Sequence, residues 1–91
     1  MTLDELKDLI KETYSDDYEV LLFDTPSYAD AFMGISEDKR AVYDYDKMVE
    51  YLQREEDMEY DEAAEFVNYN TLRALPYMGS NAPIVYYPWE I

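Results

Sequence analysis

The chain has 91 residues with 22 acidic and 7 basic side chains, no histidine and no cysteine, and a formal net charge of −15. The lack of cysteine excludes disulfides and thiolate chemistry, and the lack of histidine removes the usual zinc ligand and general base. This charge excludes unaided binding to DNA, RNA or an anionic membrane, because those surfaces are also negative, and favours a basic protein partner or high solubility. The length predicts a single compact domain over 1–91.

The N-terminal segment MTLDELKDLI has no basic region and no long apolar core, so it does not read as a signal peptide. No apolar run approaches the roughly 20 residues that a membrane span needs. We therefore expect a cytoplasmic protein without a membrane segment, and we expect no cofactor.

The spacing of leucines predicts a first helix over 3–14, with Thr2 and Glu5 forming a capping box at its start. The polar residues 15–17 interrupt the pattern. The segment 18–24, YEVLLFD, predicts a strand whose unbroken apolar centre indicates burial on both faces.

After a loop at 25–30, two short apolar segments at 31–36 and 41–45 flank the polar residues 37–40, which predicts a β-hairpin. A second helix is expected to start near Asp44 or Asp46, since either side chain can cap it.

A third helix is predicted over about 60–72, followed by a loop at 75–83 and a last strand at 84–89. Trp89 is expected to cover the core. The predicted fold class is α+β, in the order α-β-β-β-α-α-β. About three helices would cover one face of a small, mainly antiparallel sheet of three to four strands.

Three segments, DAFMGIS (30–36), AVYDYDKMVEYL (41–52) and DEAAEFVNYNTLRALPYMGSNAPIV (61–85), resemble a family of small bacterial and phage proteins of unknown function. EFVNYNTL followed by APIV is the most distinctive part. The resemblance implies a compact α+β domain found in prokaryotes and their mobile elements, and it implies neither an activity nor site residues.

Motifs for catalysis or calcium binding fail on spacing. A calcium loop starting at Asp44 would place Met48 at position 5 and Val49 at position 6, where glycine is needed. With 22 acids, pairs of carboxylates occur by chance, and the serines have no histidine to activate them. We therefore expect no metal site and a protein that is not an enzyme.

Tyrosines are abundant in the second half of the chain, and they allow two interpretations. They could form an aromatic binding surface, because tyrosine is favoured at interfaces. Alternatively, and as the favoured interpretation, most are half-buried rings with their hydroxyls in water. The tyrosines concerned are Tyr43, Tyr45, Tyr51, Tyr60, Tyr69, Tyr77, Tyr86 and Tyr87.

The strongest feature is REEDMEYDEAAE, residues 54–65, within a stretch (44–65) of ten acids and two bases. If this part is helical, carboxylates one turn apart lie about 5–6 Å from each other, the scale on which a nucleic-acid backbone presents phosphates. The predicted partner-binding residues are Glu55, Glu56, Asp57, Glu59, Asp61, Glu62, Glu65, Tyr51 and Tyr60, the two tyrosines stacking on arginines.

In size and charge the chain resembles the acidic inhibitors that phages and plasmids use against CRISPR and restriction systems. That resemblance implies a basic protein surface as partner, such as a nucleic-acid-binding defence complex. The alternative is a structural or regulatory interaction module whose acidity only serves solubility. The oligomeric state stays open.

Overall fold

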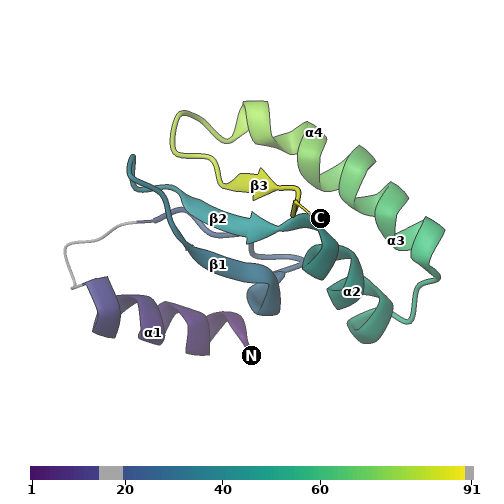
Figure 1. Cartoon of the computed structure of the whole chain (residues 1–91), viewed down its shortest axis with the longest axis horizontal. Helices are drawn as coiled ribbons and strands as arrows, with labels where there is room; N and C mark the ends of the chain where they lie inside the picture. Colours follow the sequence, from purple (N-terminus) through teal and green to yellow (C-terminus); the bar gives the residue numbers. More distant parts are fainter. Residues whose placement is uncertain (15–19, 90–91) are drawn as a thin grey trace.

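The computed structural model describes residues 1–14 and 20–89, and within them it confirms the α+β fold class. Figure 1 shows the three strands in the middle, α1 (Leu3–Tyr14) beside β1, and the chain from α3 to α4 running along the opposite side of the molecule. The hairpin is confirmed, with β1 (Phe32–Ile35) antiparallel to β2 (Ala41–Asp44). β3 (Ile84–Tyr86) pairs with β2 in parallel, so the sheet is mixed, in the order β1-β2-β3.

Helix α1 begins as predicted, because the capping box forms. The Glu5 N–H donates to Thr2 Oγ1 and the Thr2 N–H donates to Glu5 Oε1, each over 3.1 Å. Helix α2 (Tyr45–Glu55) starts directly after β2, and Asp44 is its cap, accepting a hydrogen bond from the Lys47 N–H. Of the two predicted caps, the structure therefore uses Asp44.

The predicted helix over 60–72 is present but is not uniform. It consists of α3 (Tyr60–Phe66), a π-helical segment η2 (Val67–Thr71) and α4 (Leu72–Ala74). The 3-10 helix η3 (Leu75–Tyr77) continues it, and another 3-10 helix, η1 (Ala29–Ala31), precedes β1. A π turn holds one more residue than an α turn and is often found near functional sites.

One face of the sheet carries the core. Phe32 pairs with Tyr43 and Ile35 with Ala41, so these four side chains share a face. In a regular strand, positions 32 and 35 would lie on opposite faces, because side chains alternate. The irregular register between Phe32 and Gly34 allows them to share a face, because a bulge resets the alternation of side chains. The opposite face is more open, and Met33 on β1 is 52% exposed. The helices therefore lie over one face, as predicted.

The predicted strand at 18–24 is wrong for its described part, because residues 20–24 form no strand. Residues 18–19 and the predicted break at 15–17 lie outside the described residues. The Phe23 N–H donates to the hydroxyl of Tyr43 over 3.2 Å, a side chain and not a strand carbonyl. The Phe23 ring packs on the Tyr43 ring with centroids 4.7 Å apart. This apolar segment fills the core across the inner face of the sheet instead of joining it, and Leu21 is 40% exposed.

Tyr43 is the centre of this core. Its side chain is fully buried between Phe23, Phe32 and the helices, and burial raises the pKa of its hydroxyl to about 12. Tyr28 is also buried, and burial raises the pKa of its hydroxyl too. That hydroxyl lies 2.6 Å from Thr71 Oγ1, which ties the segment before β1 to the π-helical turn.

Candidate functional site

The seven predicted carboxylates lie at the junction between α2 and α3. Glu55 is the last residue of α2, Glu56 caps its end, and Glu59 precedes α3. The other four are Asp57, in the connection, and Asp61, Glu62 and Glu65, in α3. All seven are exposed, and α2 packs against α3. The junction therefore presents them on a connection between two packed helices.

The spacing of these carboxylates differs from that in a continuous helix. Residues 56–59 are not helical, and Asp57 has a left-handed backbone with φ of 54°, which aspartate tolerates better than most residues. Only the pair Asp61–Glu65 therefore has the predicted one-turn separation within a helix. The pairs Glu55–Glu59 and Asp57–Asp61 span the turn, so their separation is set by the connection.

Arg54, the basic residue next to the junction, already takes part in ion pairs. Arg54 donates to Asp30 Oδ2 over 2.6 Å and contacts Glu55 Oε1 at 3.3 Å. Asp30 also accepts a hydrogen bond from the amino group of Met1 at 2.8 Å, which lowers the pKa of its carboxyl. Within residues 1–14 and 20–89, Glu55 is the one member of the seven with an ion pair. Within the described residues, the other six carboxylates thus have no ion pair that offsets their charge.

The two predicted tyrosines have different environments. Tyr60, at the start of α3, is 58% exposed. Tyr51 is half-buried: its hydroxyl lies 3.2 Å from Ser27 Oγ and its ring packs beside that of Tyr28. The guanidinium carbon of Arg54 lies 5.9 Å from the centre of the Tyr51 ring. Tyr60 is therefore the more accessible of the two for a partner.

The remaining aromatic side chains are more exposed than expected. Five of the eight tyrosines in question are exposed, so the expectation that most are half-buried is wrong: Tyr60, Tyr69, Tyr77, Tyr86 and Tyr87. The expectation for Trp89 is also wrong, because its side chain is 82% exposed and covers no core. β3 ends at Tyr86, so the chain leaves the sheet before Trp89 can fold back.

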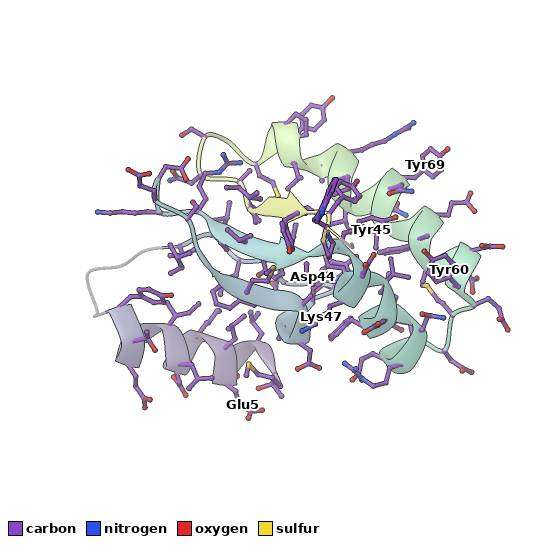
Figure 2. All side chains as sticks on the ribbon, in the orientation of Figure 1. Glu5, Asp44, Tyr45, Lys47, Tyr60 and Tyr69 are labelled. Carbon is purple, nitrogen blue, oxygen red and sulfur yellow. The ribbon has the colours of Figure 1, made fainter. Side chains whose placement is uncertain are left out.

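Tyr45 and Tyr60 can be followed in Figure 2, where Tyr60 and Tyr69 come from the same outer helical arm, which consists of α3, η2 and α4. The Tyr45 ring stacks on Tyr87 with centroids 4.7 Å apart, and its hydroxyl donates to Asn68 Oδ1 over 3.1 Å. Burial raises the pKa of the Tyr45 hydroxyl, and the Asn68 contact opposes that shift. These contacts hold the start of α2 to the π-helical segment.

Two hollows lie along the outer arm, and sequence reasoning missed most of their residues. Glu62 and Glu65 line one hollow together with Met58, Phe66 and Asn70. The apolar and amide positions 58, 66 and 70 gave no signal on their own. A signal was present in the separation of positions 62, 66 and 70 by four residues each, which places these side chains along one side of a helix.

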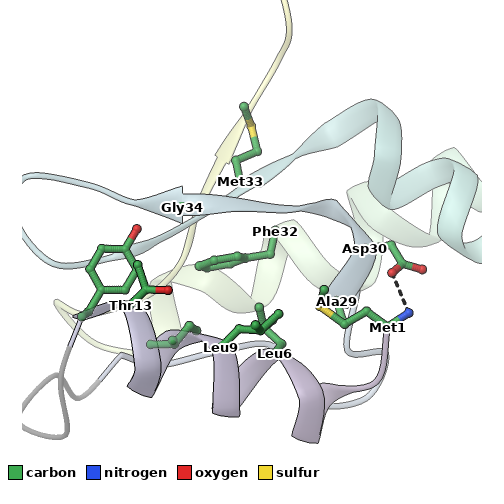
Figure 3. A pocket seen from close by; sticks show the side chains of 11 residues that line it. Met1, Leu6, Leu9, Thr13, Ala29, Asp30, Phe32, Met33 and Gly34 are labelled. Atoms are coloured by element: carbon green, nitrogen blue, oxygen red, sulfur yellow. Dashed lines mark hydrogen bonds and ion pairs between the residues drawn. The ribbon is translucent and has the colours of Figure 1, made fainter.

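A third pocket, of about 280 Å³, lies between α1 and β1 (Figure 3). Leu6 and Leu9 come from α1, Phe32 points toward them from β1, and Met33 points to the other side of the strand. None of the nine predicted binding residues lines this pocket. Its walls are mostly apolar, so it offers packing space and little for polar recognition.

Groups of three or more acidic side chains placed to hold a metal ion do not occur among the described residues. Over the same part of the chain, no helix combines the length and apolar character required to cross a bilayer.

The geometry defines an acidic α+β domain with an exposed carboxylate junction between two packed helices. No family model, curated protein or solved structure matches the chain. The similarity to small phage proteins and to acidic inhibitors therefore stays a prediction from the sequence.

Proposed function

We propose that the protein is a non-enzymatic binding protein that docks on a basic protein surface through the α2–α3 junction. In its concrete form it is an inhibitor of the phage or mobile-element type, whose carboxylates mimic nucleic-acid phosphates and block the basic channel of a CRISPR or restriction complex. It would act inside the prokaryotic host cell, where such complexes are found.

The observation that supports the proposal is the exposure of seven carboxylates at the junction between α2 and α3, six of them without an ion pair among the described residues. Anchoring by two packed helices limits the entropy that these groups lose on binding. Attraction between a field of this sign and a basic channel would accelerate association and weaken as salt rises.

A second candidate is an interaction module whose acidity only serves solubility. One observation favours it: α1 also carries exposed acids, at Asp4, Asp8 and Glu12, remote in sequence from the junction. If acidity serves solubility alone, the position of the charge is unimportant and only its amount counts.

Two triple variants with the same change in charge separate the candidates. The first is Asp61→Asn, Glu62→Gln and Glu65→Gln on α3; the matched control is Asp4→Asn, Asp8→Asn and Glu12→Gln on α1. Both sets lie on exposed sides of a helix and include its first turn. The measurement is displacement of labelled double-stranded DNA from purified CRISPR effector and restriction complexes, in low and high salt.

We expect the wild-type protein to displace DNA from one of these complexes, with a steep loss as salt rises. The α3 variant should displace it roughly tenfold less well, or worse, and the α1 variant almost as well as wild type. Neutralising all seven carboxylates of the junction should abolish displacement. Equal effects of the two triple variants would contradict a specific site and favour the solubility candidate.

A further inference from the structure

Two adjoining hollows border the arm formed by α3, η2 and α4, and together they are called the groove here. One hollow, of about 320 Å³, lies along α3, and a second, of about 150 Å³, lies along η2 and α4. Phe66 and Asn70 line both hollows, so the two adjoin at these residues. Positions four apart along the arm run through both of them: Glu62, Phe66, Asn70, Ala74 and Met78.

The π-helical segment explains why this row stays aligned. In an α-helix, positions four apart drift by about 40° around the axis at each step, because one turn holds 3.6 residues. A turn with one extra residue takes back part of that drift. On the inner side, Val67 is fully buried and Thr71 is bound to the Tyr28 hydroxyl, so the core holds the segment in place.

The floor of the groove is apolar, and its rim carries acidic side chains beside one cation, Arg73, whose guanidinium carbon lies 4.7 Å from the centre of the Tyr69 ring in the first hollow. Met58, Phe66 and Met78 are half-buried along it, whereas Glu62, Glu65 and Asp24 are exposed. None of these three carboxylates takes part in an ion pair within the described part of the chain. The groove therefore suits a ligand that combines apolar groups with positive charge.

Asn70 stands where the two hollows meet. Its side chain is exposed, and it has no hydrogen-bond partner among the residues that the structure describes. A carboxamide offers one acceptor and two donors in a plane, which can pair with the N–H and C=O of one residue in an extended chain, because these two groups point to the same side. In a helical ligand these groups are already bonded internally, whereas in an extended segment they are free.

We infer that this groove binds an extended segment of a basic protein. Apolar side chains occupy the hollows on either side of Asn70, whose carboxamide pairs with the ligand backbone, and lysine or arginine side chains reach Glu62, Glu65 and Asp24. The arm is roughly 20 Å long from the helical rise, enough for about six extended residues. The positive charge of the ligand rests on the proposed function; the extended shape and the apolar contacts go beyond it.

Labelled ten-residue peptides test the inference by fluorescence anisotropy in low salt. One peptide alternates arginine with leucine, and the other contains arginine alone. The protein variants are Asn70→Ala and Asn70→Asp, with Asn81→Ala as the matched control, since Asn81 is exposed on the loop before β3 and lines neither hollow. Circular dichroism confirms that each variant is folded.

We expect the alternating peptide to bind more tightly than the arginine peptide, although it carries fewer charges. Asn70→Ala should weaken binding of the alternating peptide about tenfold, because it removes hydrogen bonds worth about 1.4 kcal/mol. Asn81→Ala should leave this binding unchanged. Asn70→Asp adds negative charge but removes both donors, so it should weaken the alternating peptide and leave the arginine peptide bound at least as tightly.

Two results would overturn the inference while leaving the proposed function intact. One is equal binding of both peptides with no effect of Asn70→Ala, which would mean that the surface recognises charge alone. The other is tighter binding by a helical peptide of the same composition, insensitive to both Asn70 variants. Failure of both peptides and of every basic complex to bind would instead contradict the proposed function itself.

Discussion

The region around α1 and the region around α2 and α3 are both helical and acidic, yet they are held very differently. Among the residues that the structure describes, three buried ones, Leu6, Ile10 and Ala29, form the cluster under α1. Ten buried residues of the same described ranges form the cluster under α2 and α3, and Leu52 and Val67 there are fully buried. A clear helical pattern in sequence therefore does not measure how strongly a helix is anchored.

The difference also affects function. The junction stands on the larger cluster, so its carboxylates are presented by the better-packed half of the molecule. Helix α1 borders an open pocket, and Leu9 on it is 45% exposed. Segments with few buried apolar contacts open more readily than the core. We therefore expect α1 to open locally at a lower free energy than α2.

The largest effect should come from the core of the α2–α3 region. Leu52→Ala leaves a cavity among fully packed neighbours and should lower the free energy of unfolding by about 3–4 kcal/mol. The matched control, Leu9→Ala on α1, removes a side chain that is already 45% exposed and should cost less than about 1 kcal/mol. Urea unfolding measures both, and equal losses would erase the contrast between the regions.

Alkaline pH should weaken the same core by a somewhat smaller amount. Burial raises the pKa of Tyr43 to about 12 in the folded protein, against about 10 in the unfolded chain. Because the folded pKa is the higher one, this stabilisation is complete below pH 10 and is lost as the pH rises toward 12. The expected loss is about 2–3 kcal/mol.

Urea unfolding between pH 9 and pH 12 measures this loss. Tyr43→Phe removes this titrating group and should make the slope shallower, leaving the part that comes from Tyr28 and Tyr45, whose pKa burial also raises. It also costs stability at pH 9 by deleting the hydrogen bond from the Phe23 N–H. Tyr77→Phe is the control, since Tyr77 is 90% exposed, and it should leave the slope unchanged. An unchanged slope in Tyr43→Phe would assign the alkaline transition to other groups.

The smallest effect should come from the start of α1. Thr2→Ala removes the hydroxyl that accepts from the Glu5 N–H, and should cost about 1 kcal/mol, as loss of a helix cap does. Hydrogen exchange should become faster in the first turn of α1 and stay the same in α2. Faster exchange in both helices would mean that α1 and the main core unfold together.

The helices and the hairpin followed from the sequence because their signals are local. The capping box at Thr2, the cap at Asp44 and the polar turn between two short apolar segments each act within a few residues. The strand at 20–24 failed for the opposite reason. An apolar run indicates burial, but whether it joins a sheet depends on a free strand edge, and here it packs across the inner face.

The candidate site likewise has features that the sequence predicts and features that it does not. Exposure of the carboxylates was predictable, because uncompensated charge is too costly to bury. Their arrangement was not, since the turn at 56–59 and the left-handed Asp57 separate two helices that the spacing alone would join. The groove beside Asn70 could not be predicted either, because the segment at 23–26 supplies one of its walls from a distant part of the chain.

By itself, the amino-acid sequence determined the fold class, most helix positions and the acidic character of the surface, because capping, periodicity and charge are properties of short segments. Only the tertiary structure decided the mixed sheet, the π-helical turn and the meeting of two hollows at Asn70. These features depend on which distant segments pack together, and the packing around Tyr43 and Tyr28 selected one arrangement.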